Sequence, residues 1–311
     1  MKTPLRCRDD GSFTIIQFTD THFENGEPED LRTAALLERV LATETADLVL
    51  FTGDVLGPGC RDARAAWAMA TAPLVRRGLP WAAVFGNHDD ESGAATRAEL
   101  MAIQQGIPGC LSRPGPRTLS GLGNYLLHVG RADGTGTAAT LCCLDAHTYA
   151  ETDIGGHGWV RDDQIRWFTR SLAPLRQGRG TTATQPVLVF LHIPLPEFDE
   201  VWRLGGCVGE KNEEVCCPRI NTGFFAAMHL SGRVRGVFCG HDHVNDFQGG
   251  LHGIRLCYGR ASGYNTYGQD GFARGARIIR LYDDGRDFDT WLRLEDGRRV
   301  ECALPPSDRA I

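Results

Sequence analysis

The chain has 311 residues, of which 42% are hydrophobic and 23% are charged, and its formal net charge is −6. It is long enough to bury a large core. Nucleic-acid and anionic-membrane partners call for a basic excess or a basic stripe, so neither is expected. The N-terminus lacks the apolar run of a secretory signal, and no segment approaches the roughly 18 apolar residues of a membrane span. The sequence therefore predicts a soluble, cytoplasmic protein.

Three strand–helix units are expected in the first third of the chain. Short apolar runs predict the strands, and apolar residues at helical spacing predict the helices. The expected strands cover 13–18, 48–51 and 81–85, and the expected helices cover 31–43, 61–76 and 94–105. This alternation predicts a parallel sheet with covering helices.

The rest of the chain is less regular. Residues 108–123 are predicted to form a loop, and 193–221 are predicted to form the longest irregular segment. Further strands are expected at 124–129, 138–144, 187–191, 234–239, 254–258, 277–282 and 288–294, and further helices at 162–175 and 222–230. No repeat, linker or change of composition divides the chain. We therefore expect one domain over 1–311, with its core at about 13–296 and its last dozen residues as a tail.

Polar side chains follow five of the strand-like runs at the point where each run ends. They are Asp20, His22, Asp54, Asn87, His88, His192, His241 and His243. In open α/β sheets, ligands gather at the carboxyl ends of strands, so these side chains can converge. Taken singly, a strand-end aspartate is typical of a turn cap, and a lone histidine of a core residue. The set as a whole includes five of the ten histidines and indicates a metal centre.

The order D-x-H, G-D, G-N-H-D, H and G-H-x-H, spread over residues 20–243, resembles the calcineurin-like metallophosphoesterase superfamily. The runs GNHDDES, HIPLPEF, NTGFF, GHDHVNDF and LCYGR are similar to one of its branches. That branch contains plant purple-acid-phosphatase-like proteins and a fungal phosphatase of cell-cycle control, and the similarity covers roughly residues 14–280. The resemblance implies an α/β (α+β) fold, a four-layer α/β/β/α sandwich of two mixed sheets.

The same resemblance implies a pair of metal ions with seven protein ligands. The ligands of the first ion are Asp20, His22 and His243. Those of the second ion are Asn87, His192 and His241, and Asp54 bridges both ions. Carboxylate, imidazole and amide ligands suit Mn, Fe or Zn, and the sequence leaves the choice among them open. Gly57 stands where true purple acid phosphatases carry a tyrosine ligand, so we expect a centre without tyrosinate.

The resemblance gives catalytic roles to two residues that follow Asn87. A hydroxide that bridges the two ions would attack phosphorus, and His88 would protonate the leaving oxygen as general acid. Asp89 would orient His88 through its second ring nitrogen, while Asp242 is expected to be solvated or to support a ligand.

These roles predict a hydrolase of phosphate esters, and specifically a phosphomonoesterase. The substrate is a small molecule or a phosphoprotein, and the sequence does not distinguish them. One alternative is a phosphodiesterase with the same centre. Another is a non-catalytic scaffold that retains the fold, although such proteins commonly lose ligands that are all present here.

Several other regions leave alternatives open. The 194–221 segment borders the site or is a solvated excursion, and the 221–223 turn binds phosphate or only begins a helix. Tyr258, Arg260, Tyr264 and Tyr267 form a pocket wall or only pack their loop. Three of the eleven cysteines, Cys207, Cys216 and Cys217, share one polar segment and could form a disulfide or a labile metal site. Cys142, Cys239 and Cys257 are expected in the core.

Overall fold

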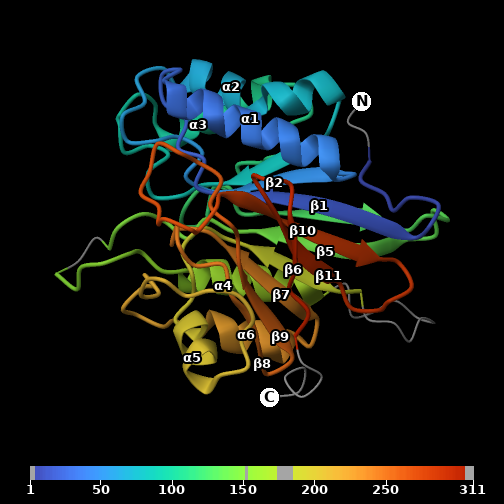
Figure 1. The fold of residues 1–311 in the computed structure, drawn as a ribbon. Coiled ribbons are helices and arrows are strands. Elements are labelled where there is room, and N and C mark those ends of the chain that lie inside the picture. Colours follow the sequence, from blue (N-terminus) through green and yellow to red (C-terminus); the bar gives the residue numbers. More distant parts are fainter. Residues whose placement is uncertain (1–3, 151–152, 174–184, 305–311) are drawn as a thin grey trace.

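The computed structural model describes residues 4–150, 153–173 and 185–304. Two six-stranded sheets pack against each other, and helices cover the outer face of each sheet (Figure 1). The predicted α/β/β/α sandwich of two mixed sheets is confirmed. None of the helices in the described residues is both long and apolar enough to cross a bilayer.

The first sheet has the order β12-β11-β10-β1-β2-β3. Its strands are β1 (Ser12–Phe18), β2 (Leu48–Thr52), β3 (Trp81–Val84), β10 (Gly275–Tyr282), β11 (Asp289–Leu294) and β12 (Arg299–Glu301). Strands β1, β2 and β3 are parallel, whereas β10 runs antiparallel to β1. The carboxyl ends of β1, β2 and β3 therefore lie at one edge of this sheet.

The second sheet has the order β4-β5-β6-β7-β9-β8. Its strands are β4 (Tyr125–Gly130), β5 (Thr137–Cys143), β6 (Val187–Phe190), β7 (Val234–Cys239), β8 (Gln248–Leu251) and β9 (Ile254–Tyr258). The four inner strands β5, β6, β7 and β9 are parallel, and β4 and β8 pair antiparallel at the two edges. The predicted hairpin of β4 and β5 is confirmed.

Three hydrophobic layers hold the sandwich together. The layer between the sheets includes Ile15 and Leu50 from the first sheet and Phe190 and Phe238 from the second, all with 0% exposure. The helices α1 (Pro28–Thr43), α2 (Ala63–Arg77) and α3 (Arg97–Gly106) pack on the first sheet. The helices α4 (Asp162–Leu172), α5 (Glu197–Leu204) and α6 (Phe224–Ser231) pack on the second. Since both sheets are covered, strands such as β2, β3 and β6 read as nearly continuous apolar runs.

Three elements differ from the expectation. Helix α5 lies inside the segment predicted to be irregular, where Phe198 and Val201 bury one face of two short turns. Strand β8 contains Gly249 and Gly250, a pair that is typical of a turn, but here Gly249 approaches Val201 closely. Strand β12 lies where the tail was expected. The predicted helix 162–175 ends at Leu172, and its last two residues lie outside the described part of the chain.

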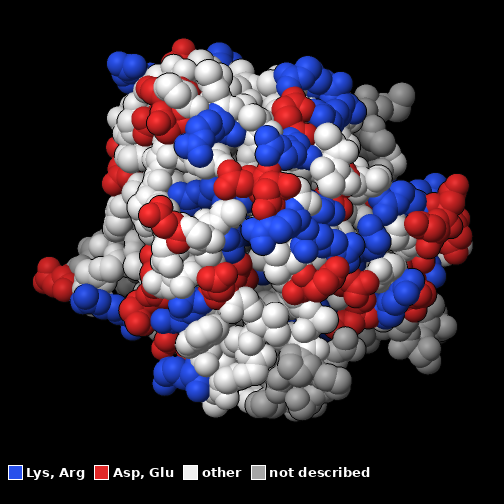
Figure 2. All heavy atoms as spheres, in the orientation of Figure 1, with Lys and Arg blue, Asp and Glu red and all other residues white. Residues whose placement is uncertain are grey.

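Charged side chains of both signs are interspersed on the face drawn in Figure 2. Exposed charged side chains of the chain form ion pairs, including Arg298 with Asp296 and Arg286 with Asp284. No field of a single sign therefore covers this face.

Candidate metal centre

The polar residues that follow the strands of the two sheets converge at the shared edge of the sandwich. Asp20 and His22 follow β1, Asp54 follows β2, and Asn87 follows β3. His192 follows β6, and His241 and His243 follow β7. Asp20, Asp54 and His192 are fully buried at 0% exposure, so the site lies beneath the surface.

Four candidate ligands of the first ion form one cluster. Asp20, His22, Asp54 and His243 each offer an atom within 4.8 Å of the others. The His243 Nε2 lies 3.5 Å from Asp20 Oδ1, and the His22 Nε2 lies 3.9 Å from Asp54 Oδ2. These separations leave room for a cation among the four atoms.

The candidate ligands of the second ion form an adjacent cluster. Asp54, His192 and His241 each offer an atom within 4.8 Å of the others. The His192 Nε2 lies 3.1 Å from Asp54 Oδ2 and 3.2 Å from the Asn87 Oδ1. Asp54 belongs to both clusters, which is the position required of a bridging ligand.

Unpartnered polar atoms support a cation at this place. Both ring nitrogens of His22 and the Oδ2 of Asp54 are buried and have no hydrogen-bond partner. Leaving such a buried atom unpaired costs about 1–3 kcal/mol. A cation bound by these lone pairs would remove that cost, so the donor set fits a metal ion.

Two of the imidazoles are held by hydrogen bonds at their other ring nitrogen. The Nδ1 of His192 donates to the Thr52 carbonyl over 2.8 Å, which leaves Nε2 to face the Asp54 carboxylate. The Nδ1 of His243 lies 2.7 Å from the Thr266 hydroxyl. Such partners fix the orientation of a metal-binding histidine and raise its basicity.

The backbone at the candidate ligands is unusual. Asp20, His22, Asp54 and His241 have φ angles of 52°, 45°, 49° and 80°, in the left-handed region. Non-glycine residues in this region cost about 1–2 kcal/mol each, and such strain clusters at functional sites. Gly86 permits the close approach of two loops, because a Cβ there would overlap the Asp54 carboxylate. The His88 amide donates to Asp54 Oδ1 over 2.8 Å in that space.

The charges of the site reinforce each other. Burial alone would raise the pKa of Asp20, but a hydrogen bond from His243 and its charge lower it to about 2. Burial lowers the pKa of His22 to about 3. Burial would also lower the pKa of His192, but the negative charges of Asp54 and Asp20 raise it to about 9. At neutral pH the carboxylates are ionised, and a cation would displace the His192 proton.

The structure corrects the role assigned to Asp89. Its carboxylate accepts hydrogen bonds from the backbone amides of Gly86, Val55 and Leu56 at 2.7, 2.9 and 3.0 Å. Asp89 therefore joins the loops after β2 and β3, and the carboxylate at the Nδ1 of His88 is Glu91. The expectation failed because three acidic residues follow His88, and the turn geometry decides which of them reaches the ring.

The His88 ring itself stands beside the first cluster. Its centroid lies 5.4 Å from that of His22, and its side chain is 27% exposed. It is thus accessible from outside while the ligands beneath it are buried. The general-acid role of His88 stays a prediction.

Tyr149, Glu91 and His157 were missing from the sequence prediction, whereas Cys216 was named there among three cysteines that could form a disulfide or a labile metal site. Tyr149 places its hydroxyl 3.4 Å from the Asn87 side-chain nitrogen and 3.3 Å from Glu91. The Nε2 of His157 lies 3.1 Å from that of His241, and the Cys216 Sγ lies 3.3 Å from the same His157 atom. None of these side chains follows a strand, so the strand-end pattern gives no signal for them.

The structure gives different roles to the aromatic and basic residues that the sequence left as either a pocket wall or loop packing. Tyr267 stacks on His243 with centroids 4.2 Å apart, so it flanks the site. Tyr258 is buried and donates to Asp242 over 2.5 Å, and Asp242 is buried rather than solvated. Arg260 pairs with Asp246, and Tyr264 bonds Glu295, so these two side chains are engaged elsewhere.

The turn at 221–223 is engaged in local contacts. The Asn221 side chain bonds Glu197 and accepts from the Gly223 amide, while the Thr222 hydroxyl donates to the Val160 carbonyl. No disulfide bond joins any two cysteines of the described residues, so the suggested disulfide does not form, and Cys142, Cys239 and Cys257 are buried as expected.

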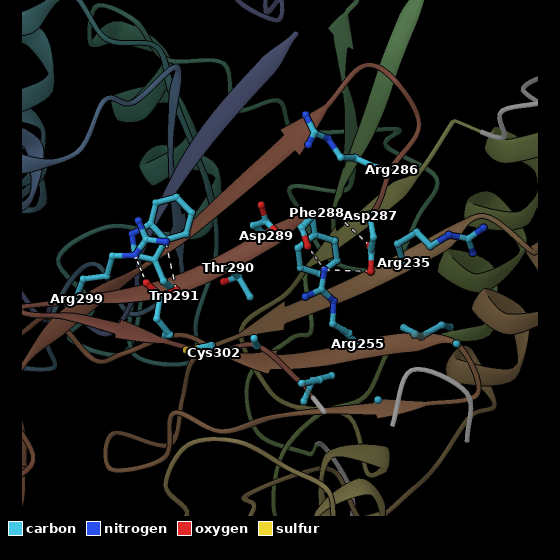
Figure 3. Close-up of a pocket in the computed structure, with 16 residues that line it drawn as sticks. Arg235, Arg255, Arg286, Asp287, Phe288, Asp289, Thr290, Trp291, Arg299 and Cys302 are labelled. Carbon is cyan, nitrogen blue, oxygen red and sulfur yellow. Dashed lines mark hydrogen bonds and ion pairs between the residues drawn. The ribbon is translucent and has the colours of Figure 1, made fainter. Parts of the chain in front are cut away.

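A cavity of about 480 Å³ lies at the opposite end of the sheets (Figure 3). Arg235, at the start of β7, lines it, whereas His241 follows the end of that strand. Its other arginines are paired: Arg255 lies 3.3 Å from Asp287, and Arg299 lies 2.6 Å from Glu301. The cavity is therefore separate from the ligand clusters and carries little uncompensated charge.

Comparison with known proteins agrees with this geometry. The model of the calcineurin-like phosphoesterase family matches residues 13–245, most of the chain and every candidate ligand. The chain belongs to the calcineurin-like phosphoesterase family. The predicted family is thus confirmed, together with a candidate metal site of aspartate and histidine side chains.

Similar proteins come from plants, yeast and fish. The chain is 35% identical to a protein of Arabidopsis thaliana named probable inactive purple acid phosphatase 14, over 94% of this chain and 83% of that protein. It is 32% identical to phosphatase DCR2 of Saccharomyces cerevisiae, over 93% of this chain and 55% of that protein. A dimetal phosphatase from Danio rerio shares the fold, with a TM-score of 0.62 at 13% identity over 94% of this chain and 99% of that one.

Proposed function

We propose that this calcineurin-like phosphoesterase is a two-metal hydrolase that acts on phosphomonoesters. The observation that carries the proposal is the membership of Asp54 in both ligand clusters. A shared carboxylate holds two cations close together, which a single-ion site would not require. The relative named phosphatase DCR2 supports the choice of monoesters.

Bound ions would supply Lewis acidity toward phosphate oxygens and lower the pKa of a water molecule. The chain would hold them with carboxylates that are ionised at neutral pH and with imidazoles whose second nitrogen is fixed by Thr52 or Thr266. Oxygen and nitrogen donors of this kind fit Mn, Fe or Zn.

His88 would hold the proton that the leaving oxygen needs. Its Nδ1 lies against Glu91, so Nε2 is the nitrogen left to face a substrate. A positioned general acid of this type contributes about 10²–10⁴-fold to the rate. The partly exposed ring would meet a phosphate ester that enters from solvent, whether a small molecule or a phosphoprotein.

The word inactive in the names of the plant relatives favours a different outcome, a scaffold without catalysis. Such a loss of activity usually follows the loss of ligands or of the general acid. In this chain Asp54, Asn87, His88 and both histidines after β7 are present. The assembled site supports catalysis over the scaffold.

A paired assay on protein of known metal content tests the proposal. Turnover of p-nitrophenyl phosphate and of bis-p-nitrophenyl phosphate is compared after loading with Mn, Fe or Zn and after chelation. We expect faster monoester turnover that chelation abolishes. Faster turnover of the diester would show that the protein is a phosphodiesterase and not a phosphomonoesterase. Two bound ions without turnover of either ester, or of a panel of phosphorylated peptides and metabolites, would favour the scaffold.

A further inference from the structure

A third group of ligand atoms lies beside the second ligand cluster. His157 comes from the loop between β5 and α4, Cys216 from the segment between α5 and α6, and His241 from the end of β7. One ligand atom from each lies within 4.8 Å of the other two. Three segments that are distant in sequence therefore bring two imidazoles and a thiol to one point.

Two of the three spacings in this group are slightly shorter than those around a tetrahedral zinc ion, and the third is within 4.8 Å. Zn–N bonds of about 2.0–2.1 Å and a Zn–S bond of about 2.3 Å place neighbouring ligand atoms roughly 3.3–3.6 Å apart. The two Nε2 atoms are 3.1 Å apart, and the Cys216 Sγ lies 3.3 Å from His157 Nε2. Small side-chain adjustments would admit the ion.

The backbone around His157 and Cys216 holds both side chains in position. Tyr149 and His157 form a β-bridge, and the Gly158 amide donates to the Thr148 carbonyl over 2.7 Å. The amide of Cys216 donates to the buried Asp242 carboxylate over 3.2 Å. The His157 ring stands at 82° to that of His241, and its Nδ1 is buried without a hydrogen-bond partner.

The chemistry of this group differs from that of the two clusters beneath it. Those clusters combine carboxylates with imidazoles, whereas this one combines a thiol with two imidazoles. Thiolate and imidazole ligands together favour Zn²⁺ over Mn²⁺ or Mg²⁺. Three protein ligands leave a fourth position open to water or another small ligand.

We propose that His157, Cys216 and His241 bind a further Zn²⁺ at the outer side of the second ligand cluster. This zinc site is additional to the seven ligands of the metal pair and does not depend on catalysis. It shares His241, whose Nε2 faces His157, with the second cluster. Binding a cation at each ring nitrogen requires His241 to release its N–H proton to solvent and to bridge the two ions as an imidazolate.

Cobalt substitution tests the zinc site without an activity assay. Zinc is replaced by Co²⁺, and the near-ultraviolet absorption that arises from thiolate-to-cobalt charge transfer is recorded together with bound metal per chain. We expect the band in the unaltered protein, its loss in Cys216→Ser with one fewer bound ion, and a weakened band in His157→Gln. The matched control is Cys217→Ser, which should keep the band because Cys217 is outside the group.

Two results would overturn the zinc site: no thiolate band in the unaltered protein, or a band that persists in Cys216→Ser. Circular dichroism of each variant excludes unfolding as the cause, and the exposed position of Cys216 makes that control feasible. Turnover of p-nitrophenyl phosphate is measured separately, so failure of the zinc site and failure of the proposed phosphatase activity are distinguishable.

Discussion

The first and second sheets contribute different halves of the metal site. The loops after β1, β2 and β3 supply both aspartates, together with His22 and Asn87. The loops after β6 and β7 supply three imidazoles. One half is therefore anionic and the other half is formed by neutral or protonated rings.

The two halves also differ in how their polar atoms are satisfied. The atoms without a partner, on His22 and Asp54, belong to the first-sheet half. In the second-sheet half, His192 and His243 are held by Thr52 and Thr266. The second half is thus oriented before an ion arrives, whereas the first half is completed by the ion. In a site built from two sheets, one sheet can therefore supply ligands that are already oriented, and the other can supply ligands whose unpaired atoms favour metal binding.

The largest expected effect follows from removing the shared carboxylate of the first-sheet half. Asp54→Ala should lose both ions and reduce phosphatase activity to background, because Asp54 belongs to both clusters. Metal content per chain and turnover of p-nitrophenyl phosphate measure the two losses. Asp162→Ala, at an exposed carboxylate on α4, serves as the control. If Asp54→Ala retained both ions, Asp54 would not be needed to bind them. The first-sheet half would then not be the half that depends on the ions for its completion.

The next effect concerns His88, which belongs to the first-sheet half but is not assigned to an ion. His88→Ala should keep the metal content and lower kcat by about 10²–10⁴-fold. His128→Ala, on the exposed side of β4, is the matched control. If His88→Ala emptied the metal site instead, His88 would be a metal ligand. The assignment of Asn87 as ligand and His88 as general acid would then be wrong.

A smaller effect tests the orientation of the second-sheet half. Thr266→Val removes the hydroxyl 2.7 Å from the His243 Nδ1. Loss of such a partner typically weakens metal affinity by about 10–100-fold. Competition with a chromogenic chelator measures that affinity. Thr169→Val, on the exposed face of α4, should leave it unchanged, and equal affinities in both variants would show that Thr266 does not orient His243.

The smallest expected effect is thermal. An ion present at 100 times its dissociation constant stabilises the folded state by about 2.7 kcal/mol. Chelation should therefore lower the unfolding temperature by several degrees, and Asp54→Ala should show little change on chelation. Differential scanning calorimetry with and without chelator provides the comparison. The same decrease in both proteins would mean that the stabilising ion binds elsewhere.

The candidate ligands could be predicted from sequence because parallel strands end at one edge. Asp20, Asp54, His192 and His241 each follow a short apolar run, and that topology brings them together. His157 could not be predicted in this way, because a β-bridge inside a loop positions it. The pairing of His88 with Glu91 rather than Asp89 depends on a turn whose geometry the residue types alone do not determine.

The fold shows the same limit at a larger scale. Strands β1, β2 and β6 could be predicted from the sequence because each is a short run of residues that are all buried. Helix α5 was missed because eight residues present only two turns, and prolines precede them. Strand β8 was missed because a glycine pair is locally typical of a turn, and the close packing of Val201 on Gly249 exists only in three dimensions.

The left-handed backbone at Asp20 and Asp54 lowers the stability of the fold, although both aspartates are candidate metal ligands. Glycine adopts this conformation without steric cost, so Asp54→Gly would relieve strain of about 1–2 kcal/mol and remove a buried charge. In a directed-evolution experiment that selects only for thermal resistance without metal, such replacements are expected to accumulate. They would yield robust proteins with the family's architecture and none of its chemistry. Selection for function therefore has to act at these positions continuously.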